Sequence, residues 1–431
     1  MKTKLIMLSA IALSTTLAVS GSAVAATKTT KKKTTTKTTV KATTTLAPAS
    51  AAPTTAAKAA GPIKYTVIGS FQSAVLNFPE VQGMFDARVK AVNEAGGVNG
   101  RKVEVTYCND KFDANEAANC ARKAVADGSV GVSSPITLFG SQILDVLEPA
   151  GVPYIASIAT GATAETSSKV SFPMNGGSFV GALAMGQIAS ATDGCRIAGS
   201  ISSLSSRTAG QVVGVKQAFE FNRGLWVGDV DAQGATDYAP LVAQVLSQNP
   251  DCLFALNGPA DVPKLLTALA QSGKKVKIYA NAATFPGAIL SALPSSLTDG
   301  ITLISPYATI FDAATVPEVS ELIAETTKYG VSEKDQAGSF SIEAWAEAKL
   351  VLAQMKLIQG DVTAASMLAQ MNKNVDPGTT LFGGPFALKP STINGYTRVY
   401  NFNEFVYQIK NKALVLQRKV NAEKTAAAYK A

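Results

Sequence analysis

The stretch that decides the fold runs from Lys90 to Val125 and reads KAVNEAGGVNGRKVEVTYCNDKFDANEAANCARKAV. It predicts the end of a helix, a glycine-rich stop, a strand, a loop and a second helix. Gly96-Gly97 accepts the positive φ that a helix C-terminus favours, and valines alternate with polar residues from Arg101 to Tyr107, as in a strand. Asp113 suits a helix N-cap, with Glu116 placed as in a capping box. This alternation of helix and strand predicts an α/β fold with a parallel sheet.

The same stretch resembles a known family. The wording N-E-A-G-G-V-N-G-R-K-V from Asn93 to Val103, followed by C-N-D at Cys108 and A-x-x-C-A-R-K from Ala117, resembles the N-terminal lobe of type I periplasmic binding proteins, the branched-chain amino acid receptor family of ABC importers. The resemblance runs from about Ile63 to about Leu416. It implies two doubly wound parallel-sheet lobes joined by a multi-strand hinge. It also implies a small-molecule ligand that is delivered to an ABC permease in the membrane.

The N-terminus predicts export. Residues 1–26 read as a secretory signal peptide, with a basic start at Lys2 and Lys4, an apolar stretch over Leu5–Val19 and an A-x-A site at Ala23-Val24-Ala25 that predicts cleavage after its last residue. The apolar run is shorter than the ~20 residues that a membrane span needs. No Cys lies near the cleavage site, so a lipoprotein is not expected. We expect a secreted, extracytoplasmic protein of the periplasm or the cell-wall space.

The positive charge of the chain belongs to this end. Residues 27–60 consist almost entirely of Thr, Lys, Ala and Pro, a composition typical of a disordered linker. This linker is either a flexible spacer or a stalk that touches an anionic cell wall or carries O-glycans. The first 60 residues hold nine Lys and no Arg, Asp or Glu, so residues 61–431 keep 30 of the 39 basic residues against 31 acidic ones. A nearly neutral folded part gives no reason to expect a nucleic-acid partner.

The pattern of strands and helices runs once, restarts near Pro173, and runs again. The repetition predicts two lobes, and the three crossings between them are what the resemblance implies. We predict lobe 1 at 61–175, lobe 2 at 176–301, a return to lobe 1 at 302–375, and a return to lobe 2 with a basic tail at 376–431. Residues 408–431 look helical, with Lys410, Lys412, Arg418 and Lys419 as the basic residues of this tail.

The four cysteines of an exported chain suggest two disulfides. Cys108 ends a predicted strand and Cys120 lies in the next helix, and the resembled family often has a bridge in this region. Cys195 and Cys252 each open a predicted strand, so a second bridge is feasible if those strands are neighbours in a parallel sheet. A metal site is the alternative, but the chain has neither a C-x-x-C motif nor any His.

The absence of His narrows the possible chemistry. It excludes Ser-His-Asp and Cys-His catalysis and the usual zinc enzymes. The sequence also contains no G-x-x-x-x-G-K-[ST] phosphate loop and no G-x-S-x-G motif. We therefore predict a protein that is not an enzyme and that carries no metal and no cofactor.

The candidate ligand residues follow the predicted strands. In open parallel sheets, ligands bind outside the carboxyl ends of the strands, and two lobes that face each other close by hinge motion. The candidates in lobe 1 are Phe71, Gln72, Ser133, Ser134, Ser157, Ala159 and Thr160. Those in lobe 2 are Ser206, Arg207, Asn257, Asn281 and Phe285.

Each candidate has a structural alternative. Ser133-Ser134 precedes a predicted helix whose free backbone N–H groups favour an anion, or it merely caps that helix. The resemblance implies that this loop and the one at Ala159-Thr160 grip a ligand carboxylate. The two phenylalanines are walls of the pocket or parts of the core. Arg207 pairs with a ligand carboxylate or lies in water, and the asparagines either donate hydrogen bonds to the ligand or form turns.

One departure from the family pattern bears on the ligand. Family receptors for amino acids place an acidic residue after the last strand of lobe 2, where it meets the ligand ammonium. This sequence has no carboxylate from Ala280 to Phe285. A buried ammonium without a counter-charge is costly, so we predict an amine-free carboxylate or a neutral small molecule. The nearest other acid, Asp237, is predicted to cap a helix.

Three functions remain. The leading one is a monomeric solute receptor that delivers its ligand to an ABC importer. The second is a ligand sensor or regulator on the same fold, and the third is a cell-wall-associated protein that no longer binds ligand. The identity of the membrane partner separates the first two, and a filled cleft would favour the third.

Overall fold

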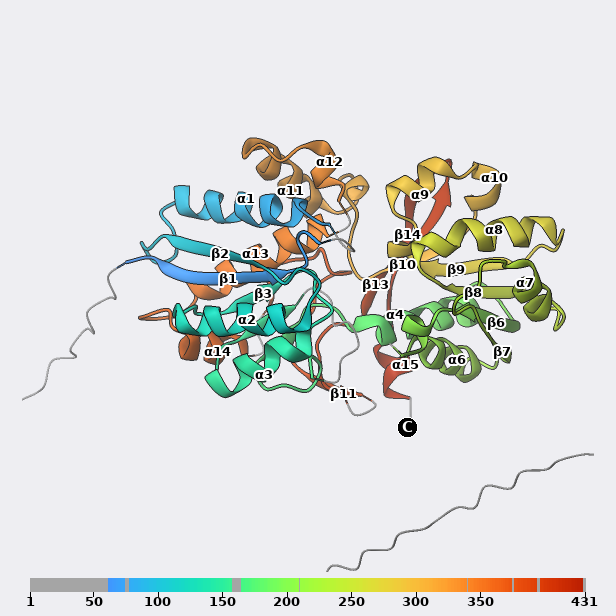
Figure 1. Ribbon diagram of the computed structural model, residues 1–431, viewed down its shortest axis with the longest axis horizontal. Coiled ribbons are helices and arrows are strands. Elements are labelled where there is room, and N and C mark those ends of the chain that lie inside the picture. The colour runs from blue at the N-terminus through green and yellow to red at the C-terminus, as the bar shows by residue number, and fades with distance from the viewer. Residues whose placement is uncertain are drawn as a thin grey trace, which may run out of the picture. The chain divides into compact units, whose positions relative to one another are not determined.

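The computed structural model describes residues 61–73, 77–156, 164–208, 210–338, 340–373, 376–393 and 396–428, except for the side chains of residues 207 and 208. The predicted signal peptide (1–26) and linker (27–60) lie outside the described residues. Two sheets with helices on both faces form the two lobes (Figure 1), which confirms the predicted fold class.

The sheet of the first lobe is parallel throughout. Its strand order is β2-β1-β3-β4-β5. The strands are β1 (Ile63–Gly69), β2 (Val103–Asn109), β3 (Val132–Ser134), β4 (Tyr154–Ala156) and β5 (Ser171–Pro173). Because all the strands run the same way, their carboxyl ends, and the loops that follow them, meet at one edge.

Helices cover both faces of this sheet. They are α1 (Glu80–Glu94), α2 (Ala114–Ala126), α3 (Gly140–Ala150), α11 (Pro317–Lys328), α12 (Glu333–Gln336), α13 (Ser341–Lys356) and α14 (Ala364–Met371). Strand β1 alternates between two cores. Tyr65 and Val67 pack on the side of α1 and α13, and Ile68 packs on the side of α2 and α3.

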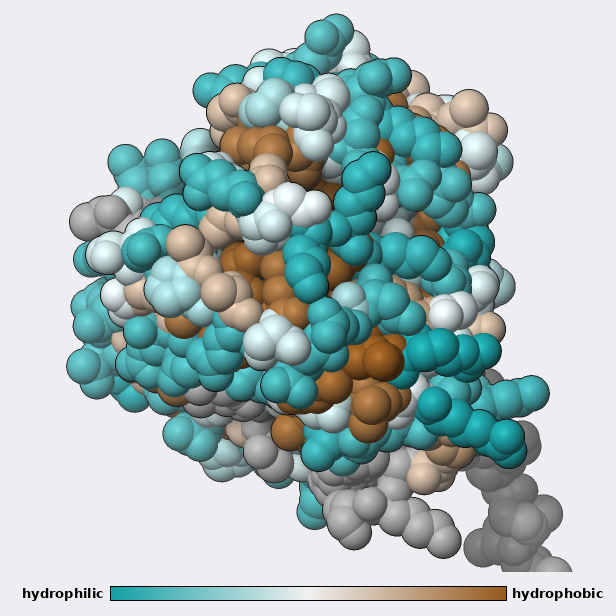
Figure 2. All heavy atoms as spheres, turned by 90° about the vertical axis from the view of Figure 1, so that its right-hand side faces the viewer, coloured by the Kyte–Doolittle hydropathy of each residue, from teal (hydrophilic) through white to brown (hydrophobic). Residues whose placement is uncertain are grey.

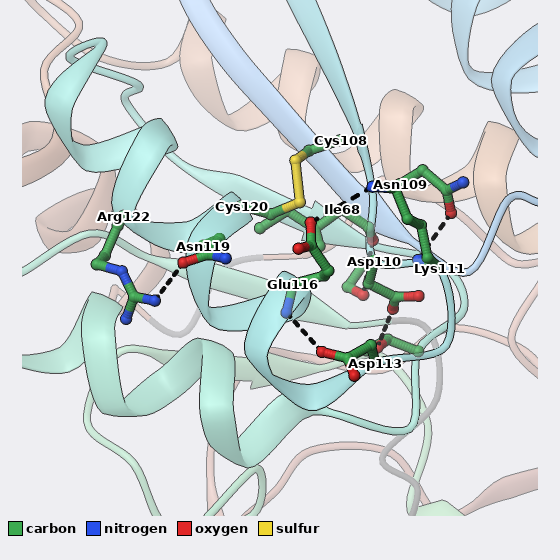
Figure 3. Close-up of a disulfide and its surroundings, with 12 residues drawn as sticks. Ile68, Cys108, Asn109, Asp110, Lys111, Asp113, Glu116, Asn119, Cys120 and Arg122 are labelled. Carbon is green, nitrogen blue, oxygen red and sulfur yellow. Dashed lines mark hydrogen bonds and ion pairs between the residues drawn. A yellow bond between two sulfur atoms is a disulfide. The ribbon is translucent and has the colours of Figure 1, made fainter.

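The stretch that predicted the fold forms as expected. Helix α1 ends before Gly96 and Gly97, which both have positive φ, and a Cβ on Gly97 would lie 2.1 Å from the Arg101 carbonyl oxygen. The side chain of Asp113 caps α2 by accepting from the backbone N–H groups of Asn115 and Glu116 (Figure 3). The chain therefore turns at the points that its glycines and its capping residue predict.

The sheet of the second lobe has the order β14-β13-β10-β9-β8-β6-β7. Its strands are β6 (Ile197–Ser202), β7 (Leu225–Asp231), β8 (Cys252–Leu256), β9 (Lys277–Asn281), β10 (Thr302–Ser305), β13 (Asn403–Lys410) and β14 (Ala413–Asn421). The first five are parallel, whereas β13 and β14 are antiparallel additions at one edge. A separate two-stranded sheet pairs β11 (Ser391–Ile393) with β12 (Tyr396–Val399).

The helices of this lobe also lie on both faces of its sheet. They are α4 (Gly177–Gln187), α5 (Leu204–Thr208), α6 (Gln211–Phe221), α7 (Ala239–Leu246), α8 (Val262–Gln271), α9 (Gly287–Ala292), α10 (Ser295–Thr298) and α15 (Glu423–Ala427). The buried strand β8 serves both faces. Leu253 and Ala255 join the core with α7 and α8, and Phe254 joins the core with α4 and α6.

The predicted helical tail is wrong. Residues 403–421 form the antiparallel pair β13 and β14, and only Glu423–Ala427 is helical. The turn between the strands is Asn411-Lys412, whose φ values are 49° and 64°. Two successive positive φ values are the mark of a type I′ hairpin turn. Burial along β14 alternates from residue to residue, so the basic residues belong to a two-sided edge strand.

Three segments connect the lobes, at residues 174–176, 306–316 and 400–402. Buried Asn401 ties two of these segments to the rest of the chain, because its Nδ2 donates to the carbonyl oxygens of Met174 (3.2 Å) and Phe382 (2.8 Å). The middle segment is bound to β13, where the Tyr407 hydroxyl donates to Asp312 over 2.5 Å. The crossings are thus hydrogen-bonded to one another and to the second sheet.

Both predicted disulfides are present, one in each lobe. Cys108 of β2 is bonded to Cys120 of α2 (Figure 3), with 5.7 Å between the Cα atoms. Cys195 is bonded to Cys252, with 6.0 Å between the Cα atoms. Strands β6 and β8 are neighbours, which is the condition that the second bridge required. Within the described part of the chain, no helix is long and apolar enough to cross a membrane.

Candidate functional site

The carboxyl edge of the first sheet is organised by one buried aspartate that the sequence did not single out. Asp110 follows β2 and has no exposed surface. Its Oδ1 accepts from the Ser70 hydroxyl (2.7 Å) and the Phe112 N–H (2.8 Å), and its Oδ2 accepts from the Thr137 hydroxyl (2.7 Å). The carboxylate therefore joins the loops that follow β1, β2 and β3, which carry several of the candidate residues.

The two candidate serines of β3 are bound within the protein. The Ser133 hydroxyl is 2.9 Å from the Tyr65 hydroxyl, and the Ser134 hydroxyl donates to the Ile68 carbonyl oxygen over 2.9 Å. Both serines are buried. The next helix, α3, begins only at Gly140, with a cap residue whose side chain makes no capping bond. The two hydroxyl groups therefore hold the end of β3 against β1 and do not cap α3.

A protein carboxylate lies close to the start of α3. A Cβ on Gly140 would lie 2.1 Å from Oε1 of Glu165, whose side chain is fully buried. The Tyr154 hydroxyl is 3.5 Å from the same oxygen. A helix N-terminus favours an anion. At α3 a carboxyl group of the protein already lies close to that position.

The other described candidates of the first lobe differ in exposure. Phe71 is 3% exposed, and its ring meets the Tyr107 ring edge-on with 6.1 Å between the centroids, so it is a core residue in this structure. Gln72 is exposed, and its backbone is held by Asn109, whose Nδ2 donates to the Gln72 carbonyl oxygen over 2.7 Å. Of these two side chains, only Gln72 is open to solvent.

Some candidates cannot be placed. Ser157, Ala159 and Thr160 lie outside the described residues, as does the side chain of Arg207. Ser206 lies in the short helix α5 and is 8% exposed, with its hydroxyl accepting from the Ser203 hydroxyl over 3.2 Å.

Asn257 occupies the carboxyl end of β8 and has a free acceptor. Its Nδ2 donates to the Tyr238 hydroxyl over 3.4 Å, and its buried Oδ1 has no hydrogen-bond partner. The Tyr238 hydroxyl faces the Asp261 carboxylate, and burial followed by this carboxylate raises the pKa of Tyr238 to about 12. Asp261 also accepts from Lys264 over 2.9 Å. Because the tyrosine proton is attracted to Asp261, the amide nitrogen of Asn257 faces the tyrosine oxygen and its Oδ1 is left free.

The loop after β9 has no acidic side chain, as the sequence indicated. Asn281 caps a short 3-10 turn, because its Oδ1 accepts from the Ala283 N–H over 2.8 Å. Phe285 is 2% exposed and belongs to the core. The nearest other acid, Asp237, accepts from the Ala239 N–H over 2.9 Å at the start of α7, as expected of a capping residue.

Two exposed leucines follow strands at the carboxyl edges of the two sheets. Leu138, after β3, is 51% exposed, and Leu204, after β6, is 48% exposed. An exposed large apolar side chain at a binding edge is a candidate contact for an apolar ligand. Sequence analysis missed both, although each lies within a few residues of a predicted site residue.

The outer face of the second lobe shows little that resembles a binding surface. Figure 2 shows it as mostly hydrophilic, with several hydrophobic areas, the more prominent of them near the middle of the view. The exposed large apolar residues of this lobe include Phe221 and Leu225, which are 58% and 59% exposed. Scattered apolar residues are normal on soluble proteins.

Among the described residues, one group of acidic and sulfur ligand atoms lies within coordination distance. It consists of Cys195, Asp251 and Cys252. Both sulfur atoms of this group are in a disulfide, so no thiolate remains to bind a metal.

Two lobes with polar and apolar side chains at the carboxyl ends of parallel strands have the arrangement in which open α/β sheets bind ligands. The family model described as periplasmic binding protein matches residues 62–402. The chain belongs to this family.

Similar proteins agree with this assignment. The Leu/Ile/Val-binding protein homolog 1 of Brucella abortus (strain 2308) is 35% identical over 68 residues, which are 15% of this chain and only 18% of that protein. A fatty acid ABC transporter substrate-binding protein from Thermomonospora curvata has a TM-score of 0.70 at 15% identity, over 86% of this chain and 94% of that one.

Two further solved structures share the fold. A branched-chain amino acid transporter substrate binding protein from Streptococcus pneumoniae, in complex with isoleucine, has a TM-score of 0.67 at 15% identity, over 84% of this chain and 99% of that one. A solute binding protein from Rhodopseudomonas palustris BisB5, in complex with 3,4-dihydroxy benzoic acid, has a TM-score of 0.65 at 17% identity, over 84% of this chain and 98% of that one.

Proposed function

We propose that the protein is an extracytoplasmic solute-binding protein that captures a small organic molecule between its lobes and delivers it to an ABC permease. The single observation that carries this proposal is the family match over residues 62–402. Such a protein does no chemistry. Its ligand stabilises the closed arrangement because it contacts both lobes there.

The ligand in this proposal is a carboxylate without an amine. The loop from Ala280 to Phe285 offers no counter-charge to an ammonium, and a buried unpaired ammonium is costly. The exposed Leu138 and Leu204 suit an apolar body. The free Oδ1 of Asn257 suits a hydrogen-bond donor on the ligand.

Within this proposal the β3 serines support the binding loop, because their hydroxyls already have partners in the protein. The carboxylate contacts then fall to candidates known only from the sequence, Thr160 and Arg207. Export by a signal peptide cleaved after Ala25, release without a lipid anchor, and a monomeric state complete the proposal.

A thermal-shift screen of the full mature chain tests the proposal. The probes are benzoate, 3,4-dihydroxybenzoate and the matched pair isoleucine and 3-methylpentanoate, which differ by the amine alone. A ligand at a hundred times its Kd stabilises the folded state by about 2.7 kcal/mol, which raises the melting temperature by several degrees. If the protein is a receptor for this kind of ligand, at least one probe should raise the melting temperature. If the ligand carries no amine, 3-methylpentanoate should raise the melting temperature more than isoleucine does.

The outcomes separate the alternatives. A larger shift with isoleucine would keep the receptor and contradict the amine-free ligand. No shift with any probe would contradict the proposed ligand class and would favour the cell-wall-associated protein, whereas a shift leaves the receptor and the ligand sensor to be separated by their membrane partner. For any ligand found, Asn257→Ala is expected to weaken binding, whereas Asn115→Ala on the exposed side of α2 serves as the control and leaves binding unchanged.

A further inference from the structure

The amino edge of the second sheet, opposite the candidate binding edge, gathers basic side chains. Strands β6 to β10 are parallel, so they all begin at this edge. Strand β13 runs antiparallel to β10, so its end and the turn that follows it reach the same edge. We call this surface the basic edge. Its basic side chains are all exposed, and they are Arg196, Arg223, Lys274, Lys275, Lys277, Lys410 and Lys412.

Backbone hydrogen bonds hold the starts of these strands side by side. The Leu225 N–H, at the start of β7, donates to the Arg196 carbonyl oxygen over 2.7 Å. The Lys277 N–H, at the start of β9, donates to the Asp251 carbonyl oxygen over 3.0 Å. Neighbouring strands lie about 4.8 Å apart, so the six strands from β13 to β7 spread these charges along a row of about 24 Å.

Two of the acidic side chains at the basic edge are bound within the protein. Asp193 forms an ion pair with Arg418 over 2.7 Å. The Asp251 carboxylate accepts from the Arg196 N–H over 2.9 Å. These two carboxylates therefore serve the ends of the strands and do not pair with the exposed basic side chains. The acidic residues of the basic edge are Asp193, Glu220, Asp251 and Asp299.

The basic edge differs in charge from the rest of the folded part. Its seven basic and four acidic residues give a net charge of +3. Residues 61–431 hold 30 basic and 31 acidic residues, so the other 23 basic and 27 acidic residues give −4. The nearly neutral total therefore hides a positive end on the second lobe.

Part of this charge has a structural explanation. Helices α6, α7 and α8 end at this edge, and cations near a helix C-terminus are stabilising. The Lys274 Nζ also donates to Asn249 Oδ1 over 3.0 Å, just after α7. Four basic side chains nevertheless have no hydrogen-bond or ion-pair partner among the described residues: Arg196, Arg223, Lys275 and Lys410. These four are available to an anion from outside the protein.

Two large apolar side chains lie at the same edge, next to one of these cations. Phe221 and Leu225 are 58% and 59% exposed, on either side of Arg223 in the chain. Two isolated apolar side chains are too few for a stable protein–protein interface. Apolar side chains interspersed with basic ones are typical of contact with the interface of an anionic membrane. A soluble polyanion would make no use of the apolar pair.

We propose that the basic edge is a surface by which the protein binds reversibly to an anionic membrane. Its basic side chains lie against the lipid headgroups, and Phe221 and Leu225 enter the interfacial region. Each basic residue near an anionic membrane strengthens binding by about fivefold. Contact at the amino edge leaves the carboxyl edge uncovered, so it needs neither a ligand nor a permease. It would keep a protein without a lipid anchor close to its membrane.

Sedimentation with lipid vesicles tests this contact, using the full mature chain without ligand. The vesicles consist of phosphatidylcholine alone, or of equal parts phosphatidylcholine and the anionic phosphatidylglycerol. We expect binding to the anionic vesicles and a steep loss of binding at high salt, because the screening length falls from about 10 Å at 0.1 M salt to about 3 Å at 1 M. The lysines of residues 27–60 are the same in every variant, so differences between variants report on the folded part.

The decisive variant combines Arg223→Gln and Lys275→Gln. Loss of two cations should weaken binding to the anionic vesicles by about tenfold or more. The control with the same change of charge combines Lys90→Gln and Lys123→Gln, two exposed lysines of the first lobe, and should bind nearly as the wild type does. Equal vesicle binding by the two double variants would overturn the proposal, because the linker or the net charge would then be responsible. A loss of stability in the decisive variant without a loss of vesicle binding would also overturn it, because the charges would then serve the helix ends.

Replacement of Phe221 and Leu225 by serine separates a membrane from a soluble polyanion. The serine variant should bind the anionic vesicles more weakly than the wild type and keep the same binding to soluble polyphosphate. If the serine variant and the wild type bind the vesicles equally, the apolar pair plays no part and the basic edge fits a soluble polyanion instead of a membrane. Circular dichroism shows whether each variant is folded.

Discussion

Replacement of Asp110 by alanine should destabilise the protein strongly. The buried carboxylate accepts three hydrogen bonds, from the Ser70 and Thr137 hydroxyls and from the Phe112 N–H. Removal leaves two buried hydroxyl groups and one part-buried N–H group without their partner, and each unsatisfied group costs about 1 kcal/mol or more. We therefore expect a loss of about 3 kcal/mol or more in the free energy of unfolding.

Asparagine at the same position separates shape from charge. It keeps the volume and one acceptor oxygen, and a hydroxyl group that rotates can accept from the new amide. We expect Asp110→Asn to cost about 1 to 2 kcal/mol. The exposed Asp127 provides the matched control, and Asp127→Ala should lie within about 0.5 kcal/mol of wild type.

Urea unfolding followed by circular dichroism measures these differences, provided that the slope of the transition stays the same in all variants. A loss below about 1 kcal/mol for Asp110→Ala would refute the reasoning, because the three donors would then have found other partners. Equal losses of unfolding free energy in the alanine and asparagine variants would also contradict it, since the side-chain volume and the acceptor oxygen that asparagine keeps would then not contribute to stability.

Two further predictions concern packing and cross-links. Gly140→Ala should lower the free energy of unfolding by about 1 to 3 kcal/mol, because the new Cβ would lie 2.1 Å from Oε1 of Glu165. Gly258→Ala is the control: no atom lies within 4 Å of its Cβ, so it should leave the free energy of unfolding nearly unchanged in the same assay. Loss of the Cys195–Cys252 bridge, which joins residues 57 positions apart, should lower the free energy of unfolding by about 4 kcal/mol. Loss of the Cys108–Cys120 bridge, which joins residues 12 positions apart, should lower it by about 3 kcal/mol, because a shorter loop restricts the unfolded chain less. Paired serine variants measure both, and the reverse order would show that loop entropy does not govern these bridges.

Much of the fold was readable from the sequence because local signals and tertiary structure agree. The helix predicted after Asp113 begins at Ala114, with the Asp113 side chain as its cap, and the preceding helix ends before Gly96-Gly97 as predicted. A capping side chain and a pair of glycines are local features. The C-terminal tail was wrongly predicted to be helical because the prediction rested on its basic residues and overlooked the turn residues Asn411-Lys412. A charge pattern says little about secondary structure, whereas two residues in the left-handed region fix a hairpin.

The hydrogen bonds of the candidate binding edge were harder to predict because they join residues far apart in sequence. Ser133 is paired with a tyrosine 68 residues earlier in the chain. Asp110 looks like an ordinary loop aspartate until Ser70 and Thr137 are placed beside it. Position after a strand therefore placed the candidates at the carboxyl edge of each sheet, but it did not show which hydroxyl groups the fold itself uses.

The buried glutamates of α13 did leave a signal in the sequence. The helix reads SIEAWAEAKLVLAQMK, and apolar residues lie on every side of it, which is typical of a helix enclosed in the core. Acidic residues in such a helix must be buried as well. Their spacing of one turn places Glu343 and Glu347 on the same face.

That face of α13 connects two parts of the molecule. Glu343 lies at the hinge beside Tyr307. Glu347 acts electrostatically on Tyr65, whose hydroxyl pairs with Ser133 on the candidate binding loop. One helix of the first lobe therefore brings one buried acid near a tyrosine of the middle crossing and another near the tyrosine that pairs with Ser133. The packing of α13 affects both places, although they lie far apart in the sequence.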